Sequence, residues 1–170
     1  MTYRFARLTA ADLESFRDLM VVFADAFEDM ASYQSRKPGA GYLASFLKQD
    51  SHIVLVAFSG DDVIGGLVAY VLDKFEQERR EIYIYDLAIA AAHRRRGVAT
   101  ALIDELRSIA RSCGAHVIFV QGDPGDDPAL ALYDKLGARE AVFHFDIEPA
   151  PGGEPRPPLL AAQAGPGPRM

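Results

Sequence analysis

Residues 85–100, YDLAIAAAHRRRGVAT, carry the pattern that decides the fold. The stretch from Glu81 to Ile89 is typical of a β-strand, and Gly97 to Ser112 repeats apolar residues at helical spacing. A short loop joins the two and ends in three consecutive arginines, residues 94–96. The sequence therefore predicts a strand that turns directly into a helix with a basic, glycine-containing start.

The start of this helix is suited to binding a diphosphate. The first amides of a helix have no partner within the helix, and the helix dipole is positive there. Gly97 lets a phosphate approach the backbone closely, and Ala99 keeps the next turn narrow. Arginine side chains add positive charge and forked donors. An arginine cluster is more often simply a solvated surface, so a second motif is needed before these residues indicate a diphosphate site.

The remaining elements follow from apolar periodicity and turn residues. Thr9, with Asp12 three residues later, predicts the start of the first helix. Strands are expected at residues 3–7, 52–58, 63–71, 81–89, 116–121 and 141–147. Helices are expected over about residues 10–28, around 42–47, at 97–112 and at 128–136.

The predicted order is β-α-α-β-β-β-α-β-α-β, an α/β (α+β) fold with a mixed sheet and helices on its faces. Residues 1–148 form the expected domain. Seven of the ten prolines fall in residues 149–170, where only Leu159 and Leu160 offer adjacent apolar bulk. That segment is expected to be a disordered tail, because it cannot bury enough surface to offset its ordering entropy. Docking through the two leucines is the alternative.

Composition narrows the class of protein. A length of 170 residues suits one domain, and a net charge of -6 argues against a nucleic-acid partner and favours cationic ones. The single cysteine, Cys113, excludes an intramolecular disulfide and a cysteine-bound zinc, and we expect no metal site. No stretch resembles a signal peptide or a membrane span, so a cytoplasmic location is expected, without membrane partners.

Two motifs resemble the GNAT acyltransferases. Residues 94–99, RRRGVA, are similar to the family signature Arg/Gln-x-x-Gly-x-Gly/Ala, and residues 127–138, DPALALYDKLGA, resemble its second motif. The resemblance implies the GNAT fold and acetyl-CoA as co-substrate, and it implies that Tyr133 donates a proton to the leaving thiolate. A half-buried packing role for Tyr133 is the alternative. The implied cofactor-binding residues are Leu87, Ala88, Ile89, Arg94, Arg95, Arg96, Gly97, Val98, Ala99, Thr100 and Tyr133.

Longer segments, residues 75–88, 125–129 and 144–147, resemble the type I aminoglycoside 3-N-acetyltransferases. This resemblance covers about residues 3–149. It implies a polycationic aminocyclitol antibiotic as acceptor, acetylated at the 3-amino group of its central ring, antibiotic resistance as the outcome, and a homodimeric enzyme.

A cationic acceptor calls for a site rich in carboxylates. Each candidate has an alternative role as a cap, turn or surface residue, and Asp127 before Pro128 is equally suited to capping its helix. The candidate acceptor-binding residues are Glu28, Asp29, Tyr85, Asp86, Asp123, Asp126, Asp127 and Asp146.

The expected reaction is direct attack of a neutral amine on the thioester. The acceptor ammonium must first lose a proton, and Asp86 is the first choice for the base or for holding a water that serves as base. The backbone at 87–89 would polarise the carbonyl. His93 and His144 are less suited as base, and Cys113 lies away from both motifs, so no acetyl-cysteine is expected.

Three functions are compatible with the sequence. The first is aminoglycoside N-acetylation. The second is a GNAT enzyme acting on a protein N-terminus or a polyamine. The third is a non-catalytic acyl-CoA-binding module. The acidic candidates and the long matched segments favour the first function over the second, and Tyr133 argues against the third.

Overall fold

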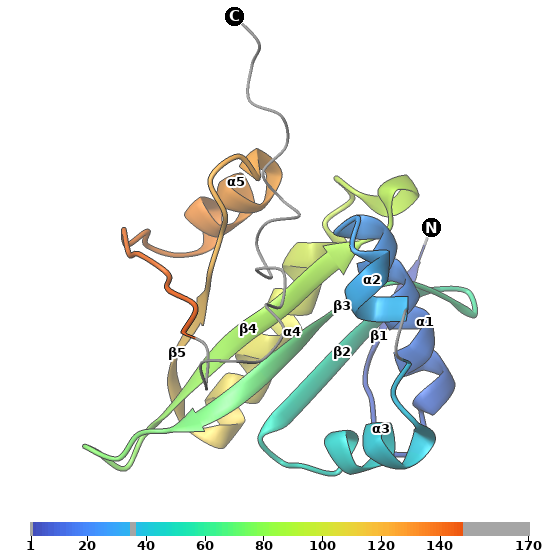
Figure 1. The fold of residues 1–170 in the computed structure, drawn as a ribbon. Helices are drawn as coiled ribbons and strands as arrows, with labels where there is room; N and C mark the ends of the chain where they lie inside the picture. Colours follow the sequence, from blue (N-terminus) through green and yellow to red (C-terminus); the bar gives the residue numbers. More distant parts are fainter. Residues whose placement is uncertain (1, 35–36, 148–170) are drawn as a thin grey trace, which may run out of the picture. The chain divides into compact units, whose positions relative to one another are not determined.

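The computed structural model describes residues 2–34 and 37–147 (Figure 1). The chain divides into two compact units, residues 1–121 and residues 122–170, and each unit is described by itself. The predicted tail, residues 149–170, and its leucine pair lie outside the described residues.

The first unit is built on a five-stranded sheet in the order β1-β2-β3-β4-β5. The strands are β1 (Tyr3–Arg7), β2 (His52–Ser59), β3 (Asp62–Asp73), β4 (Arg80–Ile89) and β5 (Ala115–Val120). Neighbours from β1 to β4 run antiparallel, and β5 runs parallel to β4. The predicted mixed sheet is therefore confirmed.

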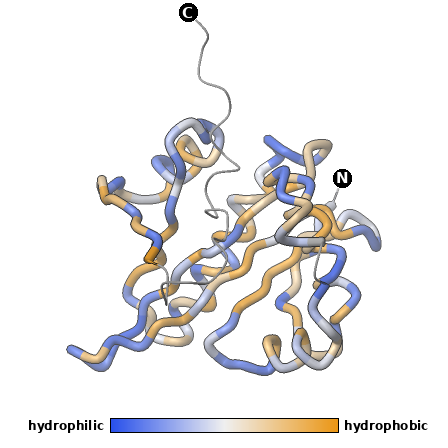
Figure 2. The backbone as a smooth tube through the Cα atoms, in the orientation of Figure 1, coloured by the Kyte–Doolittle hydropathy of each residue, from blue (hydrophilic) through white to orange (hydrophobic). Residues whose placement is uncertain are grey.

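Helices cover both faces of this sheet (Figure 1). Alternation along β2 sends Val54 and Val56 to the face where α1 (Leu13–Ala26) and α3 (Ala40–Leu47) pack. The intervening Leu55 points to the opposite face, which α4 (Val98–Cys113) covers. The hydrophobic colouring along the central strands in Figure 2 follows from this double coverage.

The structure corrects the beginning of the first helix. Thr9 and Asp12 form a closed turn in which the Asp12 carboxylate accepts hydrogen bonds from the Thr9 amide at 2.8 Å and from its hydroxyl at 2.7 Å. Since both donors come from Thr9, the pair closes the turn that precedes the helix, and α1 begins at Leu13 rather than near residue 10. A short helix that we did not predict, α2 (Met30–Gln34), follows α1.

The second unit contains α5 (Asp127–Leu136), as predicted. The predicted strand at 141–147 is wrong, because these residues have no strand partner in the described part of the chain. Val142, Phe143 and Phe145 are exposed there. An alternating apolar pattern forms a strand only where a neighbouring strand accepts its backbone hydrogen bonds, and periodicity does not reveal that neighbour.

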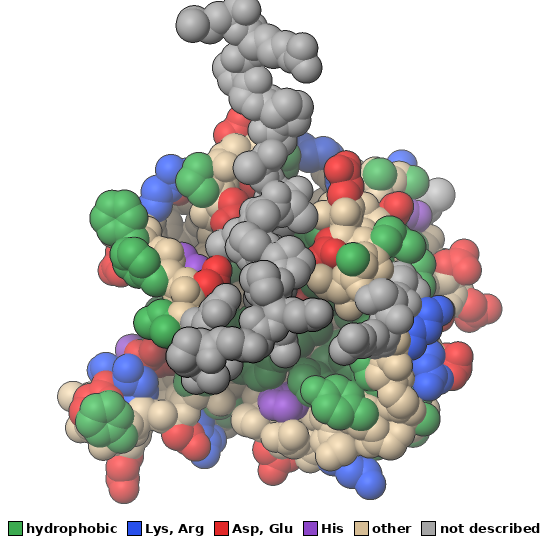
Figure 3. All heavy atoms as spheres, viewed as in Figure 1, with side chains coloured by type: hydrophobic (Ala, Val, Ile, Leu, Met, Phe, Trp, Pro, Cys, Tyr) green, Lys and Arg blue, Asp and Glu red, His purple; other side chains and the backbone are tan. Residues whose placement is uncertain are grey.

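Two surface properties bear on possible partners. Within residues 2–34 and 37–147, no helix combines the length and apolarity that crossing a bilayer requires. On the face shown in Figure 3, the described Lys and Arg side chains are scattered among acidic ones and form no continuous basic patch. This distribution fits the acidic balance of the sequence.

Candidate active site

A β-bulge in β4 defines the centre of the site. Val68 of β3 pairs with Asp86, but the next residue, Ala69, pairs with Ile84, so Tyr85 is an extra residue in β4. A bulge interrupts the strict alternation of side chains and re-aims them. Asp86 contacts Tyr33 of α2, while the Tyr85 ring contacts Tyr70 of β3. The consecutive side chains of Tyr85 and Asp86 therefore both make contacts on one face of the sheet.

Beyond the bulge, β4 has an open edge. Its pairing with β5 ends at Ile84, whereas its pairing with β3 continues to Ile89. The Ala90 amide donates to the Ile64 carbonyl at 2.8 Å, so alternation turns the backbone groups of Ile89 and Leu87 away from β3. Exposed amides and carbonyls of this kind can bind an extended amide-containing ligand as an added strand would be bound.

The loop after β4 leads into the basic start of α4. A 3₁₀ turn, η1 (Ala91–His93), is followed by the arginines, of which Arg94 donates through Nε to the Ile89 carbonyl at 2.9 Å. The backbone is left-handed at Arg95, with φ of 60°, and again at Gly97, with φ of 79°. Gly97 caps α4 without a side chain, and a Cβ there would have nothing within 4 Å. The helix start therefore has both unpartnered amides and space for an anion.

A tyrosine of α2 holds the carboxylate of Asp86. The Tyr33 hydroxyl donates to Asp86 Oδ2 at 3.0 Å. Burial raises the pKa of the Asp86 carboxyl, and the Tyr33 hydrogen bond opposes that rise. A carboxylate with a raised pKa is a stronger proton acceptor than an exposed one, which suits a general base.

Aromatic rings continue from Asp86 across the sheet. The Tyr85 ring lies 5.8 Å from Tyr70 and 5.8 Å from Tyr83, both edge to face, and Tyr83 stacks on Phe119 at 5.0 Å. Tyr85 is 51% exposed, so its ring is available to a ligand. Aromatic faces attract cations, and this row lies next to a carboxylate.

In the second unit, Tyr133 lies on α5. Asp126 caps this helix by accepting from the Ala129 amide at 3.2 Å, so the cap is Asp126 and not Asp127, which lies within the first turn. Gly122 lies close to the helix, since a Cβ on it would come within 2.8 Å of Leu130. Burial, with a smaller contribution from Asp126, raises the pKa of Tyr133 to about 12. Its hydroxyl is therefore protonated at neutral pH and able to donate.

The other predicted acidic residues lie at a helix cap, at a helix end, in a turn and in an exposed segment. Asp29 caps α2 by accepting from the Ser32 amide at 3.0 Å, and Glu28 is exposed with φ of 54° at the end of α1. Asp123 precedes the α5 cap, and its carbonyl accepts from the Asp126 amide at 3.1 Å. Asp146 is exposed and lies 3.1 Å from His144 Nε2. Of these residues, Asp29 acts electrostatically on Tyr33, which is the hydrogen-bond partner of Asp86.

Sequence reasoning missed Tyr33 and Tyr70. The signal for Tyr33 was Asp29, whose cap position starts a helix that places Tyr33 one turn later. Tyr70 alternates with Val68 on the face that carries Asp86, and burial raises its pKa, with further contributions from Tyr85 and Asp86. Both tyrosines are therefore parts of the candidate site.

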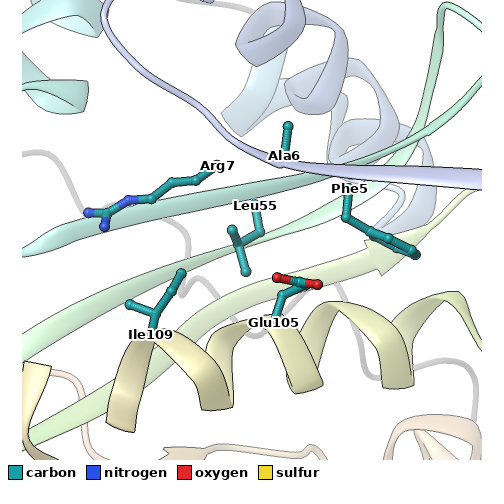
Figure 4. A pocket seen from close by; sticks show the side chains of 6 residues that line it. All are labelled: Phe5, Ala6, Arg7, Leu55, Glu105 and Ile109. Atoms are coloured by element: carbon teal, nitrogen blue, oxygen red, sulfur yellow. The ribbon is translucent and has the colours of Figure 1, made fainter. Parts of the chain in front are cut away.

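A pocket of about 230 Å³ lies on the other face of the sheet. Figure 4 shows Leu55 pointing from β2 toward Glu105 and Ile109 of α4. Drug-sized ligands usually occupy about 300–1,000 Å³, and this pocket contains none of the residues around Asp86. It is therefore not the candidate acceptor site. Within the described ranges, no three His, Cys, Asp or Glu side chains cluster as a metal site would require.

A strand with an open edge, followed by a helix start suited to a diphosphate, is the arrangement expected of an acyl-CoA site, and the family comparison agrees. The sequence profile of the acetyltransferase (GNAT) family matches residues 14–138, and the chain belongs to this family. GNAT enzymes use acetyl-CoA.

Among solved structures, the chain is similar to the aminoglycoside acetyltransferase HMB0005 from an uncultured soil metagenomic sample. The two share 47% identity with a TM-score of 0.86, over 88% of this chain and 100% of that one. The aminoglycoside acetyltransferase meta-AAC0020, also from a soil metagenomic sample and solved in complex with sisomicin, is 32% identical with a TM-score of 0.80, over 86% and 95% of the two chains.

The chain also resembles N-acetyltransferase 8B of Rattus norvegicus, at 26% identity over 101 residues. This match covers 59% of the chain and 46% of the rat protein, so the chain matches less than half the length of that relative.

Proposed function

We propose that this protein transfers the acetyl group of acetyl-CoA to an amine of an aminoglycoside, the 3-amino group of the central aminocyclitol. The observation that carries the proposal is the 47% identity to a soil aminoglycoside acetyltransferase over 88% of the chain. The charge of the site supports it, because Asp86 and the aromatic row beside it favour a cationic acceptor.

Two stretches of backbone would hold the co-substrate. The amides of residues 97–100 at the start of α4, with the side chains of Arg94, Arg95 and Arg96, would bind its pyrophosphate. The outward backbone groups of Leu87 and the outward amide of Ile89 would bind its pantetheine arm and polarise the acetyl carbonyl. The open edge of β4 and the empty surroundings of Gly97 fit such a group.

Two side chains would move protons. Asp86 accepts the proton that the acceptor ammonium gives up, directly or through one water, and leaves a neutral amine. Acetyl-CoA supplies the acyl carbon, at which the amine forms a C–N bond while the C–S bond breaks. Tyr133 would donate its hydroxyl proton to the leaving sulfur, and the second proton of the amine nitrogen would return to Tyr133 through solvent, which leaves a neutral amide and a neutral thiol.

Acceptor specificity can be tested by measuring thiol release from acetyl-CoA with gentamicin, spermidine or a peptide as acceptor. Release with gentamicin alone, and NMR of a product acetylated at the 3-amino group, supports the proposal. Release with only the peptide or only spermidine refutes the antibiotic acceptor. Binding of acetyl-CoA without release in any reaction indicates a binding module instead.

We also propose that the protein is a homodimer, as its resemblance to the type I enzymes implies. Exposed apolar side chains at Val142, Phe143 and Phe145 supply surface of the kind that a second copy would cover. Sedimentation equilibrium should give twice the chain mass, and a monomer at micromolar concentration would exclude the dimer.

A further inference from the structure

Tyr33 joins α2 to the sheet at Asp86, across 53 residues of sequence. Its ring lies 6.0 Å from the rings of both Phe23 and Phe27, so the ring is packed while the hydroxyl points to the carboxylate. Asp29, as the cap of α2, fixes the turn from which Tyr33 projects. Tyr33 is therefore held by its helix, by its ring and by its hydroxyl.

The hydrogen bond selects one oxygen of the carboxylate. Tyr33 donates to Oδ2 of Asp86, so Oδ1 remains able to accept a proton from another group. A hydroxyl has a single proton to donate, and a carboxylate only accepts, so the direction of this bond is fixed while Asp86 is ionised. Burial of Tyr33 and the charge of Asp86 both raise the pKa of Tyr33 well above its ordinary value, so it remains a donor throughout the physiological pH range.

The titratable groups around this pair are tyrosines and acids. Tyr70 of β3 and Tyr85 of β4 face it from the sheet, and Asp29 faces Tyr33 from the start of α2. Within the described ranges, Asp86 has no ion-pair partner, and Tyr33 is the only group whose interaction opposes the rise of its pKa. The Tyr33 hydroxyl is thus the group that orients this half-buried carboxylate and opposes the rise of its pKa.

We infer that Tyr33 is a positioning residue for acetyl transfer: it fixes Asp86 Oδ2 so that Oδ1 receives the proton of the acceptor amine. This inference rests on the proposed function, in which Asp86 is the base. It goes further by assigning the orientation of that base to a helix far from both motifs that define the family.

The test is Tyr33→Phe, which removes the hydroxyl and keeps the ring between Phe23 and Phe27. Loss of the hydrogen bond raises the pKa of Asp86, so the acid limb of kcat/KM should move to higher pH, by about one unit. KM for acetyl-CoA should be unchanged. Tyr42→Phe is the matched control, because Tyr42 is 67% exposed on α3, and its pH profile should equal that of the wild type.

Replacing Tyr33 by 3-fluorotyrosine changes the same bond in the opposite direction. The fluorinated phenol is a stronger donor in nearly the same volume, so the acid limb should move to lower pH. This variant retains the hydroxyl and the packing, and it keeps the inference testable if Tyr33→Phe folds poorly. A wild-type pH profile in either variant, with only the melting temperature altered, would overturn the positioning role.

Carboxyl NMR separates this inference from the proposed function. The ¹³C titration of Asp86 should move upward in Tyr33→Phe whether or not an aminoglycoside is the acceptor. An unchanged titration would overturn the inference even in an active enzyme. A shifted titration in a protein that acetylates no aminoglycoside would refute the proposed acceptor and leave the Tyr33–Asp86 coupling intact.

Discussion

Substitution of Gly97 separates the conformational role of this residue from its role in binding. Its φ of 79° is left-handed, and a Cβ would meet nothing within 4 Å, so the cost of alanine is backbone strain. An L-residue in this conformation costs roughly 1–2 kcal/mol. For a domain of this size each kcal/mol lowers the melting temperature by about 2–4 °C, so Gly97→Ala should lose about 2–8 °C. Asparagine tolerates this conformation better and should lose less.

Coenzyme A affinity should respond differently. If a pyrophosphate binds the first amides of α4, either side chain crowds it. Loss of one hydrogen bond to a charged group costs about 1.5–3 kcal/mol, which corresponds to about 10- to 150-fold in Kd. Gly97→Ala and Gly97→Asn should therefore bind coenzyme A similarly weakly, although their stabilities differ. Gly97→Glu adds charge repulsion and should abolish binding.

Calorimetric titration with coenzyme A and thermal unfolding measure the two effects. Gly60→Ala is the matched control, because Gly60 has φ of 63° and open surroundings in the β2–β3 turn. It should lose similar stability and retain full affinity. Wild-type affinity in Gly97→Asn would show that the phosphates do not lie against this backbone, and the assigned cofactor site would be refuted.

Three further substitutions are informative. Tyr133→Phe should lower kcat about 100-fold or more with coenzyme A affinity unchanged, because the lost hydroxyl protonates the thiolate; a normal kcat refutes that role. Asp86→Asn should abolish turnover. Burial raises the pKa of Asp86 in the folded protein, so ionisation of this side chain at higher pH lowers the stability of the fold. Asparagine cannot ionise, so Asp86→Asn should raise the melting temperature more at pH 8 than at pH 4. An equal rise at both pH values contradicts this reasoning. Gly66→Ala, whose Cβ would lie within 2.8 Å of Leu19 and still closer to the Leu55 carbonyl oxygen, should destabilise by about 1–3 kcal/mol by urea unfolding, whereas Gly41→Ala, in open space, should not.

Periodicity predicted most of the fold because the buried elements are regular. Nine predicted elements are present, including β4 and α4, whereas the left-handed backbone at Gly97 became visible only in the structure. The first helix was predicted too long, since Thr9 and Asp12 close a separate turn. The nine correct elements were predictable because the pattern for each one lies within its own segment of the sequence.

The site was less predictable because its contacts are non-local. The choice of Asp86 came from resemblance, but its partner Tyr33 lies on a five-residue helix too short for a periodic signal. The bulge at Tyr85 depends on the register between β3 and β4, which no window of either strand contains. The roles of Tyr133 and the acidic residues remain predictions.

Tyr85, the extra residue in β4, limits which deletions this sheet tolerates without losing its site. Deleting Tyr85 would let β3 and β4 pair residue for residue, without the bulge. The same deletion would restore unbroken alternation and remove the ring that now sits beside the carboxylate. At this one position, a regular ladder and an aromatic ring beside the carboxylate therefore exclude each other.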